Sequence, residues 1–139
     1  MLTISPQMLF FAPQPLTHTI MGLDQYAYTR KGKTQTEIAY WRKHNALQGW
    51  METLWESKGF PRQHKEDSSF NCVELRIMKK DLDQLEKDVV AGKLPKTQGF
   101  FFGSDSSEDE EYKRDTLEFV ANARQLIAEG KRVYYNSWW

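Results

Sequence analysis

Two adjacent residues, Lys43 and His44, are the side chains in this sequence most suited to carry chemistry. They lie in AYWRKHNALQGWMETLW, residues 39–55, where apolar residues recur at helical spacing. On a helix, His44 would lie at the centre of the apolar stripe and Lys43 within it. An imidazole and an ammonium group in one cleft could bind an anion such as phosphate, or activate water. The alternative is a hydrogen-bonded core histidine beside a lysine that extends its amine to solvent.

Residues from neighbouring segments could complete a cleft around this pair. LDQYAYT, residues 23–29, and VYYNSWW, residues 133–139, are both rich in aromatic residues, which predicts short strands. Each segment contains polar side chains that a strand could direct towards a ligand. The predicted ligand-binding residues are Lys43, His44, Asp24, Tyr26 and Asn136.

A second set of residues could instead form an interaction surface. A closing strand that ends in two tryptophans either covers the core or offers a stacking platform. Stacking on nucleic-acid bases requires neighbouring cations, and Lys131 and Arg132 are a weak signal for it. The predicted interaction surface comprises Arg42, Asn45, Phe101, Trp138 and Trp139.

Acidic residues gather after LPKTQGFFFG, residues 94–103. The sequence from Ser107 to Glu110 fits a helix capping box, and the acids around it would lie at the positive end of the following helix. A calcium-binding loop with its alternating Asp or Asn residues and glycine is absent. The acids therefore predict a helix start, and we expect no metal site.

The motifs of common enzymes are also missing from the sequence. It contains no phosphate-binding glycine loop, no H-E-x-x-H and no paired C-x-x-C. Cys72 is the only cysteine, so no intramolecular disulfide is possible, as is typical of a reducing cytosol. We expect no cofactor and assign no catalytic residue, which leaves open whether the chain is an enzyme.

The predicted elements alternate between strands and helices. Strands are expected at 23–29, 72–77 and 133–139, with a short three-ring strand at 100–102. A long helix is expected from Thr36 to Lys58, capped by Thr34 with Glu37, and two further helices around 82–89 and 107–129. The pattern predicts a small single-domain α/β (or α+β) fold with about three helices packed on a short sheet of three to four strands. The strand order is left open.

The first twenty residues differ from the rest of the chain. They contain no Asp, Glu, Lys or Arg, and three prolines interrupt them. We expect residues 1–20 to be a flexible leader or an upstream extension, with the folded domain at 21–139. No segment approaches the ~20 apolar residues of a membrane span. The net charge is zero, so no global field recruits nucleic acid or membrane.

Four blocks, namely MGLDQYAY, AYWRKHNALQGW, LPKTQGFFFG and YYNSWW, resemble those of a family of small proteins encoded by tailed bacteriophages. The resemblance covers Met21 to Trp139 and implies a phage protein in the cytoplasm of a host bacterium. It implies no mechanism. Some members are labelled phosphoglycerate kinase, but such kinases are much longer two-domain proteins and this chain has no readable phosphate loop.

Three functions remain open at this point. The first is a phage-type accessory protein that binds a host, phage or defence macromolecule, most simply a protein. The second is a domain for a small anionic ligand or nucleotide, which could be a hydrolase, that uses the Lys43/His44 face. The third is single-stranded nucleic-acid binding, which the neutral charge disfavours. The sequence does not indicate the oligomeric state.

Overall fold

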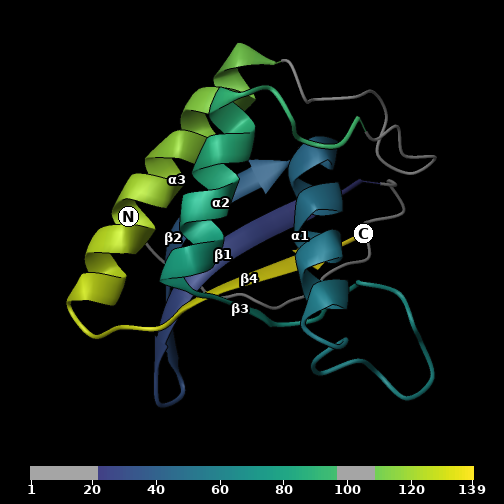
Figure 1. Cartoon of the computed structure of the whole chain (residues 1–139). Coiled ribbons are helices and arrows are strands. Elements are labelled where there is room, and N and C mark those ends of the chain that lie inside the picture. Colours follow the sequence, from purple (N-terminus) through teal and green to yellow (C-terminus); the bar gives the residue numbers. More distant parts are fainter. Residues whose placement is uncertain (1–21, 97–108) are drawn as a thin grey trace.

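The computed structural model describes residues 22–96 and 109–139 and confirms the predicted architecture of three helices on a four-stranded sheet. It is a small mixed α/β domain (Figure 1). The elements in chain order are β1 (Asp24–Lys31), β2 (Thr34–Arg42), α1 (Asn45–Ser57), β3 (Leu75–Ile77), α2 (Lys79–Val90), α3 (Glu110–Ala128) and β4 (Val133–Trp138).

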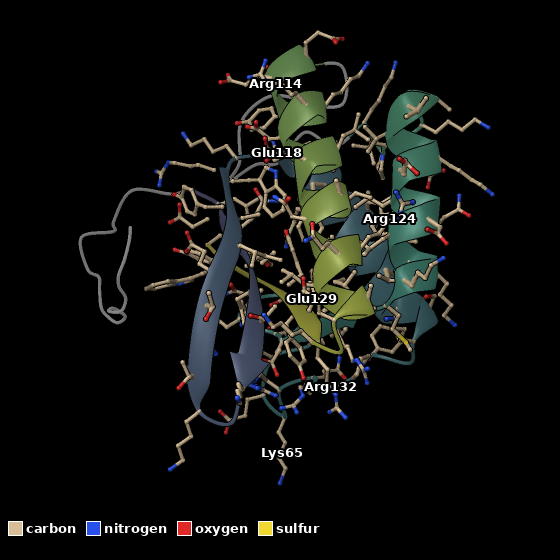
Figure 2. All side chains as sticks on the ribbon, turned by 90° about the vertical axis from the view of Figure 1, so that its left-hand side faces the viewer. Lys65, Arg114, Glu118, Arg124, Glu129 and Arg132 are labelled. Atoms are coloured by element: carbon tan, nitrogen blue, oxygen red, sulfur yellow. The ribbon has the colours of Figure 1, made fainter. Side chains whose placement is uncertain are left out.

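All strand pairings in the sheet are antiparallel, and the strand order is β2-β1-β4-β3. β1 therefore lies between its hairpin partner β2 and the last element of the chain, β4. The helices lie on one side of the sheet, and the turned view separates β1 and β2 from α2 and α3 (Figures 1 and 2). We call the helix-covered side the inner face and the opposite side the outer face.

The predicted helix from Thr36 to Lys58 is wrong in its first part. Thr34–Arg42 forms strand β2, and α1 begins only at Asn45. Gly32 lies in the two-residue turn between β1 and β2 with a φ of 62°, a conformation that glycine adopts without strain. Pairing with β1 along the whole of β2 overrides the local helix signal, so the proposed Thr34–Glu37 capping box does not form.

The core lies between the inner face and the helices. Tyr135 and Trp41 from the strands pack with Phe119 from α3, and Trp41 and Phe119 meet edge to face at 5.2 Å. Helix α3 turns one face to this core, because Phe119 and Val120 are buried and Glu118 is exposed. Figure 2 shows Arg114 and Glu118 on α3 and Glu129 directly after its end. Other buried members of the core are Ala27, Leu47, Met51, Trp55, Leu75, Ile77, Leu82, Leu85, Val89, Ala123 and Val133.

The start of α3 differs slightly from its prediction. Asp109 is the N-cap, and its side chain accepts hydrogen bonds from the backbone N–H groups of Glu111 and Tyr112. Ser107, the predicted cap, lies outside the described residues, as do the predicted strand at 100–102 and residues 1–20. None of the described helices is long and apolar enough to span a membrane.

Candidate binding face

A buried polar network begins at Gln25, which points from β1 into the inner side of the sheet. Its amide Nε2 donates to the backbone oxygen of His44 at 3.0 Å, and its Oε1 accepts from the backbone N–H of His44 at 2.9 Å. The side chain thereby satisfies two backbone groups at the residue that precedes α1. These two hydrogen bonds thus hold the turn before α1 against β1 in the middle of the sheet.

The imidazole of His44 is held between two residues of α3. Its Nε2 lies 3.0 Å from Oγ1 of Thr116, whose hydroxyl donates to the backbone oxygen of Tyr112 at 2.7 Å. Because that hydroxyl proton is already used, Nε2 of His44 must be the donor to Thr116. The ring also stacks on Tyr112 at 4.5 Å. Burial lowers the pKa of His44 to about 4, with Asp109 opposing the shift, so the imidazole is neutral at neutral pH.

The same network continues along β4. The hydroxyl of Tyr135 accepts from Nε2 of Gln25 at 3.0 Å and donates to Oε1 of Gln48 at 2.5 Å. Gln48 then donates to Oγ of Ser137 at 3.0 Å. All four side chains are buried, and they connect β1, α1 and β4 through hydrogen bonds. This is a structural network: its polar groups bond to one another within the core.

The outer face presents side chains in cross-strand rows. Alternation along the strands and the antiparallel register place them side by side. From β2 towards β3, the rows are Arg42–Asp24–Trp138, then Tyr40–Tyr26–Asn136, then Glu37–Tyr28–Tyr134–Arg76. None of the described helices covers this face (Figure 2).

One half of the outer face is closed by an ion-pair cluster. Glu74 accepts from Arg30 Nη1 through both carboxylate oxygens, at 2.8 and 2.7 Å, and from the hydroxyl of Tyr28 at 2.6 Å. The guanidinium of Arg30 lies 4.6 Å from the ring centre of Tyr134, which itself stacks on Tyr28 at 5.8 Å. Tyr28 and Tyr134 are consequently almost fully buried although none of the described helices covers them.

The other half of the outer face is open. Tyr40 and Trp138 keep 47% and 46% of their surface exposed, and Tyr26 lies beside Tyr40 with ring centres 5.3 Å apart. We call Tyr26, Tyr40 and Trp138 the aromatic patch. Asp24 accepts from the hydroxyl of Tyr40 at 2.7 Å and from Arg42 at 2.9 Å, which fixes the orientation of both side chains.

Burial and the nearby acids Asp24 and Glu37 raise the pKa of Tyr26 to about 12. The phenols of the patch therefore stay protonated at physiological pH. The patch offers neutral rings, and Arg42 beside it offers a guanidinium held by Asp24, which together suit contact with apolar and carboxylate groups.

The structure separates the predicted ligand-binding residues into two groups. Asp24, Tyr26 and Asn136 lie together on the outer face. His44 is buried in the network beneath α3, whereas Lys43 is exposed in the turn after β2 with a φ of 61°. The expected pairing of an imidazole and an ammonium in one cleft is therefore not formed by these two residues.

The predicted interaction surface is also divided. Arg42 and Trp138 share the first row of the outer face, while Asn45 is buried at the start of α1. Trp139 is partly exposed, and its backbone N–H donates to Asn71 at 3.1 Å. Phe101 lies outside the described residues.

Sequence reasoning missed several residues of the outer face. Tyr40 was assigned to a helix stripe, and Tyr28, Arg30, Glu74 and Arg76 were given no role. The alternation of Tyr26 with Tyr28, and of Tyr40 with Arg42, was the signal that could have found most of them. In the described part of the chain, no three His, Cys, Asp or Glu residues gather in a way that could hold a metal ion.

Comparison with protein-family models, curated proteins and solved structures found no match, so function has to be inferred from the chain's own residues.

Proposed function

We propose that this chain is a phage-type accessory protein that binds a host protein through the outer face of its sheet. The observation that carries the proposal is the aromatic patch, where Tyr40 and Trp138 are each nearly half exposed beside Arg42. Tyr, Trp and Arg are the residues most enriched among those that dominate protein–protein binding energy.

Rigidity of the patch supports the same proposal. The hydroxyl of Tyr40 and the guanidinium of Arg42 both bond to Asp24, and strand pairing fixes the backbone beneath them. Side chains that are already ordered lose little conformational entropy on binding. Three of the four blocks that resemble phage proteins also contribute to this face, with Tyr26 from the first, Tyr40 from the second and Trp138 from the last.

Charge on the outer face indicates the chemistry of the partner. The arginines on or beside this face outnumber the acids, and two of the three acids, Asp24 and Glu74, are already paired with arginine. The cations are Arg30, Arg42, Arg62 and Arg76, and the acids are Asp24, Glu37 and Glu74. We therefore propose a partner surface with an apolar side chain for the rings and carboxylates for the arginines.

Capture from a nuclease-treated bacterial lysate tests this proposal when the full chain is compared with two variants. Tyr40→Ser/Trp138→Ser removes the exposed rings, and Val90→Ser removes an exposed apolar side chain from α2 as the matched control. We expect a protein that the full chain and Val90→Ser retain and that the double variant loses. With that protein purified, the double variant should weaken binding at least about tenfold. Equal capture by all three chains would contradict the proposal.

Single-stranded nucleic acid is the second candidate, and the juxtaposition of open rings with arginines on the outer face favours it. It predicts capture that disappears after nuclease treatment and an affinity that falls steeply with salt. Binding that is retained after nuclease treatment and changes little with salt would exclude this candidate.

A further inference from the structure

The outward edge of β2 is the one long sheet edge among the described strands. β2 stands at the end of the strand order and contains 9 residues, whereas β3 at the opposite end contains 3. Every residue from 31 to 37 is exposed, which covers the last residue of β1, the turn and the first part of β2. The β1–β2 hairpin reaches past the ends of the helices, so none of them stands beside this part of the edge (Figure 1). Such an edge is a template for pairing with another strand.

The sequence of this edge is complementary to itself when it runs antiparallel. Residues 33–37 read Lys-Thr-Gln-Thr-Glu. When two copies pair antiparallel about Gln35, Lys33 of each copy lies opposite Glu37 of the other and Thr34 lies opposite Thr36. Opposite charges and threonine pairs are both favourable in directly opposed positions of a sheet.

Within the described part of one copy, the charges of Lys33 and Glu37 take part in no ion pair. No ion pair joins Lys33 or Glu37 to any other described residue. Glu37 lies opposite Tyr28 and Gln35 lies opposite Arg30, so both project on the outer face. Lys33 is the second residue of the turn and directly precedes β2, so its long side chain flanks the paired strands next to the Glu37 it would meet.

We propose that the chain forms a symmetric dimer in which two β2 strands pair antiparallel about Gln35. The two sheets then join into one continuous sheet with four strands from each copy. The contact is isologous, so each Lys33–Glu37 contact occurs twice. The irregularity in β2 opposite Ala27 and Tyr28 lies beyond Glu37, so the Thr34–Glu37 part of the strand is regular.

The lysine would normally oppose such pairing. Lysine on an edge strand is a common device against association with other sheets. Here the partner's Glu37 neutralises it in one register, whereas a shift of two residues removes that contact. The same charge therefore selects a dimer and disfavours open-ended aggregation. The paired segment is short, so the dimer should dissociate on dilution.

Charge exchange provides the test, with the mass of the full chain measured by sedimentation over a wide range of concentrations. Lys33→Glu and Glu37→Lys should each raise the dissociation constant of the dimer about tenfold or more, because like charges then face each other twice. The double exchange Lys33→Glu/Glu37→Lys should restore the dimer. An equimolar mixture of the two single variants should form heterodimers, since their charges are complementary.

Two controls distinguish this interface from association through a different surface. Glu118→Lys changes an exposed charge on α3 and should leave dissociation unchanged, as should the aromatic-patch variant Tyr40→Ser/Trp138→Ser. Melting temperatures should be alike for all variants that alter only charge. A chain that stays monomeric at every concentration overturns the proposal. A dimer that neither single exchange weakens, or that the aromatic-patch variant abolishes, overturns it as well.

Discussion

Gln25 and His44 are joined by two hydrogen bonds, from the side chain of one residue to both backbone polar groups of the other. The side-chain amide of Gln25 thus satisfies the backbone N–H and C=O groups of His44, as pairing with a neighbouring strand would do. Both residues are buried, so neither bond can be replaced by water without rearrangement. His44 is therefore a structural residue. Because its ring is buried in the folded chain, protonation of the ring is coupled to unfolding.

Protonation of His44 should destabilise the fold in mild acid. The pKa of His44 is lowered to about 4 in the folded chain by burial, against a value of about 6.5 when it is unfolded. Between these values the unfolded state binds more protons, so stability is present above pH 6.5 and is lost as the pH falls towards 4. We expect this residue to account for a loss of about 2 kcal/mol between pH 7 and pH 5.

Urea unfolding at both pH values measures this loss. The His44→Gln variant should be less sensitive to the pH change by the stated amount, whereas His64→Gln, in an exposed loop, should behave as the unaltered chain. Identical pH dependence in all three chains would show that His44 does not titrate as its burial implies.

Removal of one buried hydroxyl should have a large effect on stability. Tyr135→Phe deletes the oxygen that accepts from Gln25 and donates to Gln48, and leaves two buried amide groups without that partner. The expected cost is about 1–3 kcal/mol of unfolding free energy. Tyr26→Phe removes a hydroxyl from the partly exposed aromatic patch and should cost much less. Chemical denaturation of both variants checks the difference, and equal costs would contradict the role given to the network.

Loss of the Glu74 carboxylate should open the closed half of the outer face. Glu74→Gln weakens the ion pair with Arg30 and the hydrogen bond from Tyr28 in one step. We expect a cost of about 1–2 kcal/mol, because the carboxylate is largely shielded from water. Glu118→Gln on α3 is the exposed control and should be close to neutral. Thermal unfolding distinguishes the two, and a neutral Glu74→Gln would mean that the cluster adds nothing to stability.

The sequence was sufficient for the fold class and for most helix faces, because these depend on local periodicity. Leu82, Leu85 and Val89 recur as one face of a helix and are all buried. The segment from Thr36 to Arg42 was predicted as helix and is strand, since a local capping pattern favoured a helix while its strand state depends on pairing with β1. The hairpin turn at Gly32, between two aromatic segments, was the available signal.

The candidate site was harder to predict than the fold. Asp24, Tyr26, Asn136, Arg42 and Trp138 were selected for their chemical types and do share the outer face. His44 was grouped with Lys43 because they are neighbours in the chain, yet the change from strand to helix at this point buries one and exposes the other. Strand order decides such groupings, and it arises from contacts between distant residues that local patterns do not encode.

The central position of β4 in the sheet affects how the chain folds during its synthesis. β4 follows every other element in the chain but lies between β1 and β3, and the bond from Gln25 to Tyr135 spans 110 positions. During synthesis, the β1–β2 hairpin leaves the ribosome before β4. The edge of β1 that pairs with β4 therefore stays unpaired until β4 emerges. Folding should therefore be comparatively slow, as expected for a sheet closed by non-local pairing. In that interval a chaperone that shields unpaired strands would have most to contribute.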